Sequence, residues 1–261
     1  MITAIILTFN EEKHLPDCIA SLRWADEIVV FDSFSTDATA DIARQFGARL
    51  IRHRFENYAA QRNAALEATA AEWVLFVDAD ERVPPALADE ILDLTGLDRP
   101  VRSEAGWWVP RHNFIFGKLT LHAGWYPDYQ LRLLRPAFAR FDPARHVHEL
   151  ARLEGAQGYL RNPLVHLNYE TVSEFIARQY AYTHYDAGML HAQGRRARPH
   201  NFVLQPLRQF YWRYATLGGW RDGWHGLRLC ALMAYFQFVL YRDLWVVSRQ
   251  NGSGTRNANL R

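Results

Sequence analysis

The chain has 261 residues, 49% of them hydrophobic and 14% aromatic, which is enough to bury the core of one large domain or of one domain with an appendage. Its net charge is only +2, so charge gives no reason to expect a nucleic-acid partner. Cys18 and Cys230 fall in apolar helical patterns and are expected to be reduced core residues, not a disulfide. The sequence has no signal peptide and no uncharged apolar run of about 18 residues, so a spanning helix is not expected.

Strands and helices alternate through the first hundred residues. Apolar β-branched runs predict strands, and apolar residues at helical spacing predict the helices between them. The predicted strands are 2–9, 27–31, 49–51 and 73–77, and the predicted helices are 15–22, 35–46, 57–69 and 85–94. Ala38, Ile42 and Phe46 form the expected buried stripe of the second helix, which Gly47 ends. This order predicts an α/β fold with a parallel sheet and right-handed crossovers.

Two carboxylates, Asp78 and Asp80, follow the strand 73–77, whose continuous apolar run is typical of a strand buried on both faces. Ligands of open α/β sheets bind at the carboxyl ends of the strands. Two neighbouring acids are costly there unless a cation lies beside them. Hard oxygen ligands suit Mg²⁺ or Mn²⁺, and these ions usually bring phosphates. Taken alone, Asp-x-Asp is explained equally well by a surface turn.

Polar residues follow the other strands and should meet at the same edge of the sheet. They are Thr8, Asn10 and Glu11 after the first strand, Asp32 and Ser33 after the second, and Gln61-Arg62-Asn63 before the fourth. An aspartate can accept a hydrogen bond from the imide N–H of uracil, and Arg62 can offer its fork to a diphosphate. Each residue also has an ordinary role as a cap, a turn residue or a surface charge. Neither Gly-x-Gly-x-x-Gly nor Gly-Lys-Ser/Thr is present, which disfavours a dinucleotide fold and a P-loop NTPase.

Four of these motifs in order resemble the signatures of inverting family 2 glycosyltransferases with a GT-A fold. They are Thr8-Phe-Asn10-Glu11, Asp32-Ser-Phe-Ser35-Thr36-Asp37, Gln61-Arg62-Asn63 and Asp78-Ala79-Asp80-Glu81. Further similarity lies in Gly124-Trp-Tyr-Pro-Asp128, Arg132-Leu-Leu, His148-Glu149 and His166. Together they resemble the bacterial branch that includes the lipopolysaccharide core glucosyltransferases of the WaaE/KdtX type, over nearly the whole chain.

The resemblance implies a role for each matching residue. Those it assigns to the nucleotide sugar are Thr8, Asn10, Glu11, Asp32 at the uracil, Ser33, Arg62 near the base or diphosphate, Asp78 at the ribose or sugar, and Ala79. Asp80 would bind the divalent metal, Mn²⁺ or Mg²⁺, and His166 at the end of a late strand would complete its shell. The metal would stabilise the departing nucleoside diphosphate.

Inversion by direct displacement needs one base to take the proton of the acceptor hydroxyl. Glu149 occupies the place of the family's acidic motif and is assigned this role, with Asp128 in reserve. The departure from the family pattern is His-Glu where many relatives have Glu-Asp. The alternative is that Glu149 forms an ion pair with Arg145 or Arg152. Asp128 is also explained by a contact to a sugar hydroxyl or by bracing of a turn. Trp125 and Tyr126 can stack on a sugar ring or form a buried aromatic corner.

The composition shifts after residue 170. Between Gly194 and Arg228 there are seven arginines and one acid, interleaved with aromatic residues, and helices are predicted over 173–189 and 227–247. Arginine with Trp and Tyr on apolar helices suits the headgroup layer of an anionic membrane, here through residues 195–247. The alternative is that these helices cover the catalytic domain or form a homodimer interface. Nucleic-acid binding is disfavoured.

The sequence therefore predicts a GT-A catalytic domain over 1–170, with a nucleotide-binding half at 1–100 and an acceptor half at 101–170. A helical extension follows at 171–250, and 251–261 is a flexible tail. The predicted activity is inverting transfer of a hexose, glucose favoured, from a UDP-sugar to a hydroxyl of a membrane-linked glycan such as lipopolysaccharide core. The expected location is cytoplasmic, peripheral on the inner face of the cytoplasmic membrane.

Three alternatives stay open. A polyprenyl-phosphate glycosyltransferase has an acceptor that is already ionised and needs no base. A sugar nucleotidyltransferase expects a Gly-rich basic loop after the first strand, which is absent here. A non-catalytic binding module would not be expected to keep Asp78, Asp80 and Glu149.

Overall fold

The computed structural model describes residues 1–96, 104–142 and 151–256, with side chains as far as residue 250. The chain forms two compact units. The sheet unit comprises Met1–His112 and Pro127–Leu167, and the helical unit comprises Asn113–Tyr126 and Asn168–Arg261. The stretch Asn113–Tyr126 thus groups with the C-terminal helices, whereas the sequence placed it in the acceptor half of the catalytic domain.

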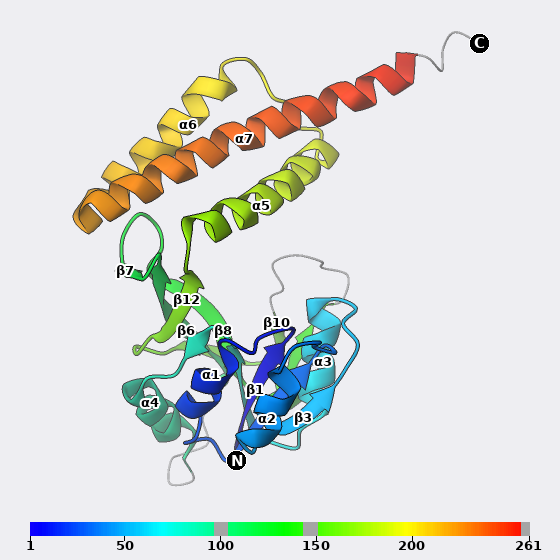
Figure 1. Ribbon diagram of the computed structural model, residues 1–261, viewed down its shortest axis with the longest axis vertical. Helices are drawn as coiled ribbons and strands as arrows, with labels where there is room; N and C mark the ends of the chain where they lie inside the picture. Colours follow the sequence, from blue (N-terminus) through cyan, green and yellow to red (C-terminus); the bar gives the residue numbers. More distant parts are fainter. Residues whose placement is uncertain (97–103, 143–150, 257–261) are drawn as a thin grey trace. The chain divides into compact units, whose positions relative to one another are not determined.

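The sheet unit opens with the predicted alternation of strands and helices (Figure 1). Its first elements are β1 (Ile2–Thr8), α1 (Leu15–Ser21), β2 (Glu27–Asp32), α2 (Thr39–Gln45), β3 (Arg49–Arg52), α3 (Tyr58–Glu67), β4 (Trp73–Asp78), β5 (Glu81–Arg82) and α4 (Pro85–Thr95). Its later elements are β6 (Glu104–Ile115), β8 (Asp128–Leu134), η1 (Pro136–Phe138), β9 (Ala139–Phe141), β10 (Ala151–Leu153), β11 (Ala156–Tyr159) and β12 (Leu164–Tyr169). The ends of β6 and β12 continue into the helical unit.

The strand order of the main sheet is β3-β2-β1-β4-β8-β6-β12-β5. The strands β1 to β4 run parallel, as the sequence predicts. Beyond β4 the sheet changes character, because β8 is antiparallel to both β4 and β6. Strand β11 adds to β6 in parallel, and β9 and β10 form a separate two-stranded pair. Because β1, β2, β3 and β4 are parallel, their carboxyl ends lie at one edge of the sheet, the edge at which such sheets bind ligands.

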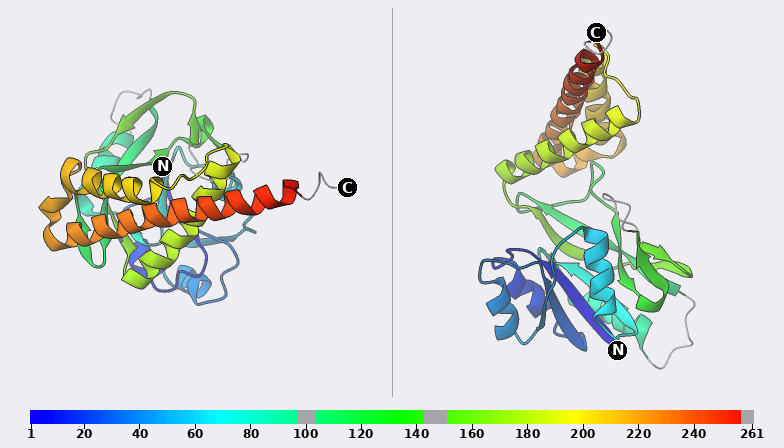
Figure 2. Two further views of the ribbon diagram at one scale, coloured as in Figure 1. Left: turned by 90° about the horizontal axis from the view of Figure 1, so that it is seen from above. Right: turned by 90° about the vertical axis from the view of Figure 1, so that its right-hand side faces the viewer.

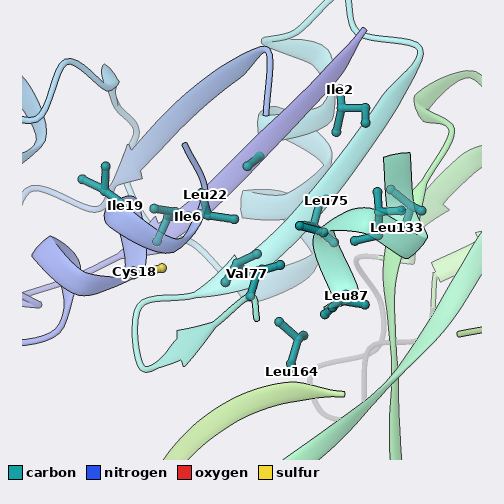
Figure 3. Close-up of a cluster of buried hydrophobic side chains, with 14 of the residues drawn as sticks. Ile2, Ile6, Cys18, Ile19, Leu22, Leu75, Val77, Leu87, Leu133 and Leu164 are labelled. Carbon is teal, nitrogen blue, oxygen red and sulfur yellow. The ribbon is translucent and has the colours of Figure 1, made fainter. Parts of the chain in front are cut away.

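Both faces of the sheet are buried. Ile6, Leu75 and Val77 lie on one face, under apolar residues of α1, α2 and α4 (Figure 3). On the other face, Ile5 and Phe76 pack against α3 and the β9–β10 pair. This burial on two sides is why β1 and β4 are apolar at almost every position.

One detail of the predicted helices is wrong. Ala38 is exposed because it is the residue before α2, and Thr39 and Ala43 take the buried positions instead. Ile42 and Phe46 are partly buried against the core, as expected. The end of the helix is as predicted, since Gly47 has a left-handed backbone with φ 78°.

The helical unit contains three long helices that lie side by side (Figures 1 and 2). Its elements are β7 (Lys118–Thr120), α5 (Val172–Ala192), α6 (Asn201–Tyr211), the π-helix η2 (Trp212–Thr216), η3 (Gly219–Asp222) and α7 (Gly223–Arg256). Phe175 of α5 and Phe236 of α7 belong to its buried hydrophobic core. Trp125 packs edge-on against Tyr169, 6.4 Å between ring centroids, so the aromatic-corner alternative describes Trp125 better than sugar stacking.

Within the described residues, one helical stretch, Gly219–Gln250, is long and apolar enough to cross a membrane by length and composition. The sequence expectation concerned an uncharged apolar run of about 18 residues, and this stretch, which carries Arg228, Arg242 and Asp243, does not contradict it. Only 22% of the apolar 18-residue segment within this stretch is buried inside the protein.

Candidate active site

The carboxyl ends of β1, β2 and β4 bring the predicted polar residues to one edge of the sheet unit. Thr8 pairs in register with Asp32, and Leu7 pairs with Asp78. Neighbouring strands lie about 4.8 Å apart, so Asp32 and Asp78 flank β1 from its two sides. The convergence that the sequence predicts is therefore present.

Asp32 is fully buried and organises the turn after β2. Its carboxylate accepts from Thr8 Oγ1 at 3.2 Å, from the Ser35 N–H at 3.0 Å and, in a very short contact, from Ser35 Oγ. The Arg52 Nε lies 3.8 Å from the same carboxylate. An ionised carboxylate has about four acceptor positions, so these contacts leave capacity for a further donor. Asp32 is thus both the turn residue and a candidate for contact with a base.

Asn10 ties the loop after β1 to the loop after β2. Its backbone is left-handed (φ 58°), which Asn adopts more readily than most residues. The Asn10 N–H donates to Ser35 Oγ at 2.8 Å, and its Oδ1 accepts from the Thr36 N–H at 2.9 Å. The Glu11 N–H donates to Thr39 Oγ1 at 2.8 Å. The two loops therefore form one ordered wall beside the strand ends.

Helix α3 faces the same edge through Gln61 and Arg62. The buried Gln61 side chain donates to Ser33 Oγ at 3.0 Å, and His53 Nδ1 lies 2.8 Å from Gln61 Oε1. The Arg62 guanidinium lies over the Phe141 ring, 5.5 Å from its centroid. Helix α3 begins at Tyr58 because the preceding residue, Asn57, caps it: the Asn57 side chain accepts from the Ala60 N–H at 2.8 Å.

Arg132 of β8 is the cation beside the first acid of the Asp-x-Asp motif. It donates to Asp78 through both terminal nitrogens, one of them in a very short contact, and to Glu81 Oε1 at 2.7 Å. Burial by itself would raise the pKa of Asp78. The charge and hydrogen bonds of Arg132, with Arg62 and Arg111 farther away, instead hold the pKa of Asp78 well below its usual range. Asp78 is therefore ionised at neutral pH.

Asp128 is engaged by a second arginine. Arg111 donates to Asp128 Oδ2 through Nε at 2.9 Å and through Nη2 at 2.6 Å, and Gln130 Nε2 donates to Asp128 Oδ1 at 2.8 Å. Arg111 also reaches Glu81 Oε1 at 3.3 Å. A carboxylate paired in this way is poorly placed to take a proton, so the geometry favours bracing over the reserve base role for Asp128.

Asp80 and His166 lie side by side. The distance from His166 Nε2 to Asp80 Oδ2 is 3.5 Å, and 9% and 21% of the His166 and Asp80 side chains are exposed. Strands β5 and β12 pair antiparallel with His166 opposite Glu81, and the Leu167 N–H donates to the Asp80 carbonyl at 2.9 Å. The backbone of two distant segments thus sets the spacing between the two side chains.

The Asp80–His166 pair fits a divalent cation. A carboxylate oxygen and an imidazole nitrogen are ligands that Mn²⁺ accepts. No group of three or more His, Cys, Asp or Glu in the described part of the chain is arranged to hold a metal. Two protein ligands would leave the remaining coordination positions to substrate oxygens and water, as is usual for ions that accompany phosphates.

The predicted site residues thus have different placements. Thr8, Asp32 and Asp78 end β1, β2 and β4, and Asn10, Glu11, Ser33, Ala79 and Asp80 follow those strands. Arg62 lies on α3, and His166 lies within β12 and not at its end. Glu149 lies outside the described residues. Arg111 was missed, and Glu81 and Arg132 were noted only as parts of motifs. A charged residue in the middle of an apolar strand, as in Leu131-Arg132-Leu133, was the available signal.

Comparisons with known proteins agree with the expected family. Residues 3–101 match the profile described as "Glycosyl transferase family 2". The chain is 30% identical over 249 residues to the "Lipopolysaccharide core biosynthesis glycosyltransferase LpsC" of Rhizobium meliloti (strain 1021), which covers 91% of this chain and 89% of that relative. It is 40% identical over 91 residues to an uncharacterized glycosyltransferase of Rickettsia felis, covering 34% of this chain and 32% of the relative.

Solved structures resemble the chain more distantly. Staphylococcus aureus TarS 1–349 in complex with UDP aligns over 96% of this chain and 91% of its own, with 16% identity and a TM-score of 0.45. Glucosyl-3-phosphoglycerate synthase of Mycobacterium tuberculosis in complex with Mn²⁺, UDP-glucose and phosphoglyceric acid aligns over 44% of each chain, with 25% identity and a TM-score of 0.34. The Rossmann-like α/β fold class that the sequence predicts is confirmed by the sheet and by the family match.

Proposed function

The chain belongs to glycosyl transferase family 2, and we propose that it transfers a hexose, with glucose favoured, from a UDP-sugar to a hydroxyl of a membrane-linked glycan such as lipopolysaccharide core. The observation that carries this proposal is the likeness to LpsC along 91% of the chain. The grouping of Asp32, Asp78 and Asp80 at one sheet edge supports it.

In this proposal Thr8, Asn10 and Glu11, at the end of β1 and in the loop that follows it, receive the nucleoside, and Asp32 accepts from the uracil. Arg62 offers its guanidinium to the diphosphate, a group whose paired oxygens suit the fork of arginine. Asp78, held ionised by Arg132, orients the ribose or the sugar by accepting from its hydroxyls.

Asp80 and His166 would hold the divalent ion, Mn²⁺ or Mg²⁺. When bound, such an ion stabilises negative charge on the diphosphate as it leaves. Arg62 and Arg132 add fixed positive charge at the same edge, although Arg132 is largely neutralised by Asp78 and Glu81.

Glu149 is the proposed base. Its carboxylate would take the proton of the acceptor hydroxyl while that oxygen forms a bond to C1 of the sugar and the bond from C1 to the diphosphate oxygen breaks. Attack from the face opposite the diphosphate inverts C1. Asp128 remains the reserve, but its engagement by Arg111 and Gln130 makes it the weaker candidate.

The exposed face of α6 supports a peripheral position on the inner face of the cytoplasmic membrane. No residue of α6 is buried. Val203, Leu204, Leu207 and Tyr211 are between 57% and 67% exposed and, at 100° per residue, fall within an arc of about 100°. We call these four residues the α6 stripe. An apolar stripe beside arginines is the pattern of a helix that lies in the headgroup layer. A homodimer interface is the alternative occupant.

The test is a thermal-shift panel of nucleotide sugars with and without Mn²⁺, followed by assay of UDP release. Only a ligand that binds the folded state raises the melting temperature. UDP-glucose is expected to give the largest shift. Glu149→Gln should lower kcat by about 10²- to 10⁴-fold and leave the shift unchanged.

Other outcomes favour the alternatives. A Glu149→Gln variant with nearly normal turnover would point to a polyprenyl-phosphate acceptor, which needs no base. Release of pyrophosphate from a sugar phosphate and a nucleoside triphosphate would indicate a nucleotidyltransferase. Binding of nucleotide sugars without turnover on any acceptor would indicate a non-catalytic module.

A further inference from the structure

Three aromatic side chains form a cluster on the antiparallel side of the sheet unit: Trp108 of β6 and Tyr129 of β8, which are partly buried, and Tyr159 of β11, which is exposed. Trp108 and Tyr159 are cross-strand partners, and their rings are nearly parallel, 6.3 Å apart at 16°. The Tyr129 ring meets the Tyr159 ring edge-on at 5.1 Å. Tyr159 is 61% exposed. We call these three residues the aromatic platform.

The position of Tyr159 is fixed by its neighbour. A Cβ atom on Gly158 would lie 2.1 Å from the Trp107 ring, so only glycine lets β11 approach β6 in this register. The Leu160 N–H then donates to the Trp108 carbonyl at 2.8 Å, and Trp108 Nε1 donates to Gln157 Oε1 at 2.8 Å. The platform is therefore ordered before any ligand arrives.

The platform lies on the same face of the sheet as Asp78. Leu131 pairs with Trp108 and packs against the cluster that contains Val74 and Phe76 of β4. Side chains alternate along a strand, so Asp78, two residues after Phe76, belongs to that face. Because β8 runs antiparallel to β4 from the pair Val74–Leu134, its first residues lie at the carboxyl end of β4.

The spacing of the strands gives the distance from the strand end that bears Asp78. Strands β8, β6 and β11 are the first, second and third neighbours beyond β4. At about 4.8 Å per strand, Tyr129, Trp108 and Tyr159 lie about 5, 10 and 14 Å to the side of β4. That span fits a short oligosaccharide that extends away from the reacting hydroxyl, and it exceeds a single sugar.

We propose that the aromatic platform binds the acceptor, by stacking under sugar residues that precede the one receiving the hexose. One face of a pyranose carries C–H bonds whose hydrogens are weakly positive, and the face of an aromatic ring is negative. The exposed Gln157 side chain, beside the indole, offers a polar partner for a hydroxyl at the rim. This inference rests on the proposed transferase function and narrows its acceptor to an extended saccharide.

The test measures transfer from the UDP-sugar to core oligosaccharides that are released from lipopolysaccharide by mild acid and fractionated by size. Tyr159→Ala should raise the KM for long fractions roughly three- to ten-fold, the value of one aromatic contact. The KM for the donor and kcat should not change. Tyr159→Phe should behave as the unchanged chain, because the ring face remains. Phe138→Ala, which removes a 43% exposed ring outside the platform, is the matched control.

The length of the acceptor makes the test specific. The effect of Tyr159→Ala should disappear with the shortest fraction that still accepts the hexose, because that fraction cannot reach the platform. An equal effect on short and long fractions, or no effect on either, would overturn the proposal while the transferase function stands. Failure of the unchanged chain to bind any UDP-sugar in calorimetry would instead contradict the proposed function.

Discussion

The imidazole of His166 lies 3.5 Å from the carboxylate of Asp80, although the two residues are far apart in the sequence. Asp80 follows β4, whereas His166 lies on β12. The antiparallel pair of β5 and β12 brings them together, and the Leu167–Asp80 backbone hydrogen bond fixes the approach. Pairing of backbones, not attraction between the side chains, thus creates the candidate metal site.

The first prediction concerns that pair. Asp80→Asn and His166→Ala should each weaken Mn²⁺ binding by at least about 10- to 100-fold, the cost of removing even an outer-shell partner of a metal ligand. Calorimetry with Mn²⁺ and UDP measures this without turnover. The metal-dependent part of the UDP affinity should be lost, and the metal-independent part should remain.

The control for the metal prediction is His184→Ala, a substitution on the exposed surface of α5. It should leave Mn²⁺ binding unchanged. If His166→Ala also leaves it unchanged while Asp80→Asn abolishes it, His166 has no place in the metal shell and β12 serves only to support Asp80.

The parallel half of the sheet was predictable because its signals are local. The run Trp73 to Val77 is apolar at every position, and strand ends follow directly from where such runs stop. Once β1, β2 and β4 are parallel, Thr8, Asp32 and Asp78 must share one edge. The order of strands beyond β4 could not be predicted, since the antiparallel pairing of β8 depends on contacts between distant segments.

The arginines of the site were harder to assign for a related reason. Arg132 was noted only within a motif, and no periodic pattern indicates that it neutralises Asp78 and Glu81. Likewise, the position of Asp32 in the sequence is consistent with a ligand contact and with a turn residue. Its hydrogen bonds with Thr8 and Ser35 depend on the fold and could not be predicted from that position.

The second prediction is that Arg132→Met destabilises the protein by up to about 3–5 kcal/mol, because it removes the closest cation from the buried carboxylate of Glu81 and from the partly exposed carboxylate of Asp78, and leaves Glu81 only the longer contact to Arg111. Glu81 is fully buried, so adding Glu81→Gln to this variant should recover part of the loss. The measurement is the midpoint and slope of urea unfolding.

The matched comparison for Arg132 is Arg140→Ala, which removes an exposed ion pair to Glu67 of similar length, 2.9 Å. Exposed pairs contribute about 1 kcal/mol or less. Equal costs for the Arg132 and Arg140 variants would mean that the Asp78–Arg132–Glu81 cluster is solvated like a surface pair.

The third prediction uses the two thiols. Burial raises the pKa of both Cys18 and Cys230, the latter to about 11, although Arg213 acts in the opposite direction on Cys230. The thiolate is the reactive form, so with a pKa near 11 only about one Cys230 in a thousand is reactive at pH 8. Iodoacetamide should label neither residue in the native chain at pH 8, and both in guanidinium chloride.

Because Cys18 belongs to the sheet unit and Cys230 to the helical unit, labelling reports the opening of each unit separately. Rapid labelling of Cys230 alone would show that the helical unit opens independently. Rapid labelling of Cys18 without guanidinium chloride would contradict its packing beneath the Asp78 carbonyl, to which its thiol donates at 3.6 Å.

The fourth prediction concerns the α6 stripe. Leu207→Glu should lower binding to vesicles of phosphatidylcholine and phosphatidylglycerol by about ten-fold or more. Burying a leucine side chain is worth about 1.5–3 kcal/mol, and about 1.4 kcal/mol corresponds to a factor of ten. Co-sedimentation at two salt concentrations measures the apolar and electrostatic parts, because salt weakens only the attraction of arginines to anionic lipid.

Tyr182→Glu on α5 is the matched control for the stripe, since Tyr182 is 55% exposed and the substitution adds the same charge. It should bind vesicles nearly as well as the unchanged chain. Alkaline carbonate should release the protein from membranes if α6 lies in the headgroup layer, because a helix that spans the bilayer resists this treatment. Retention after carbonate would favour a spanning role for α7, and a concentration-dependent dimer lost on Leu207→Glu would show that a second copy covers the stripe.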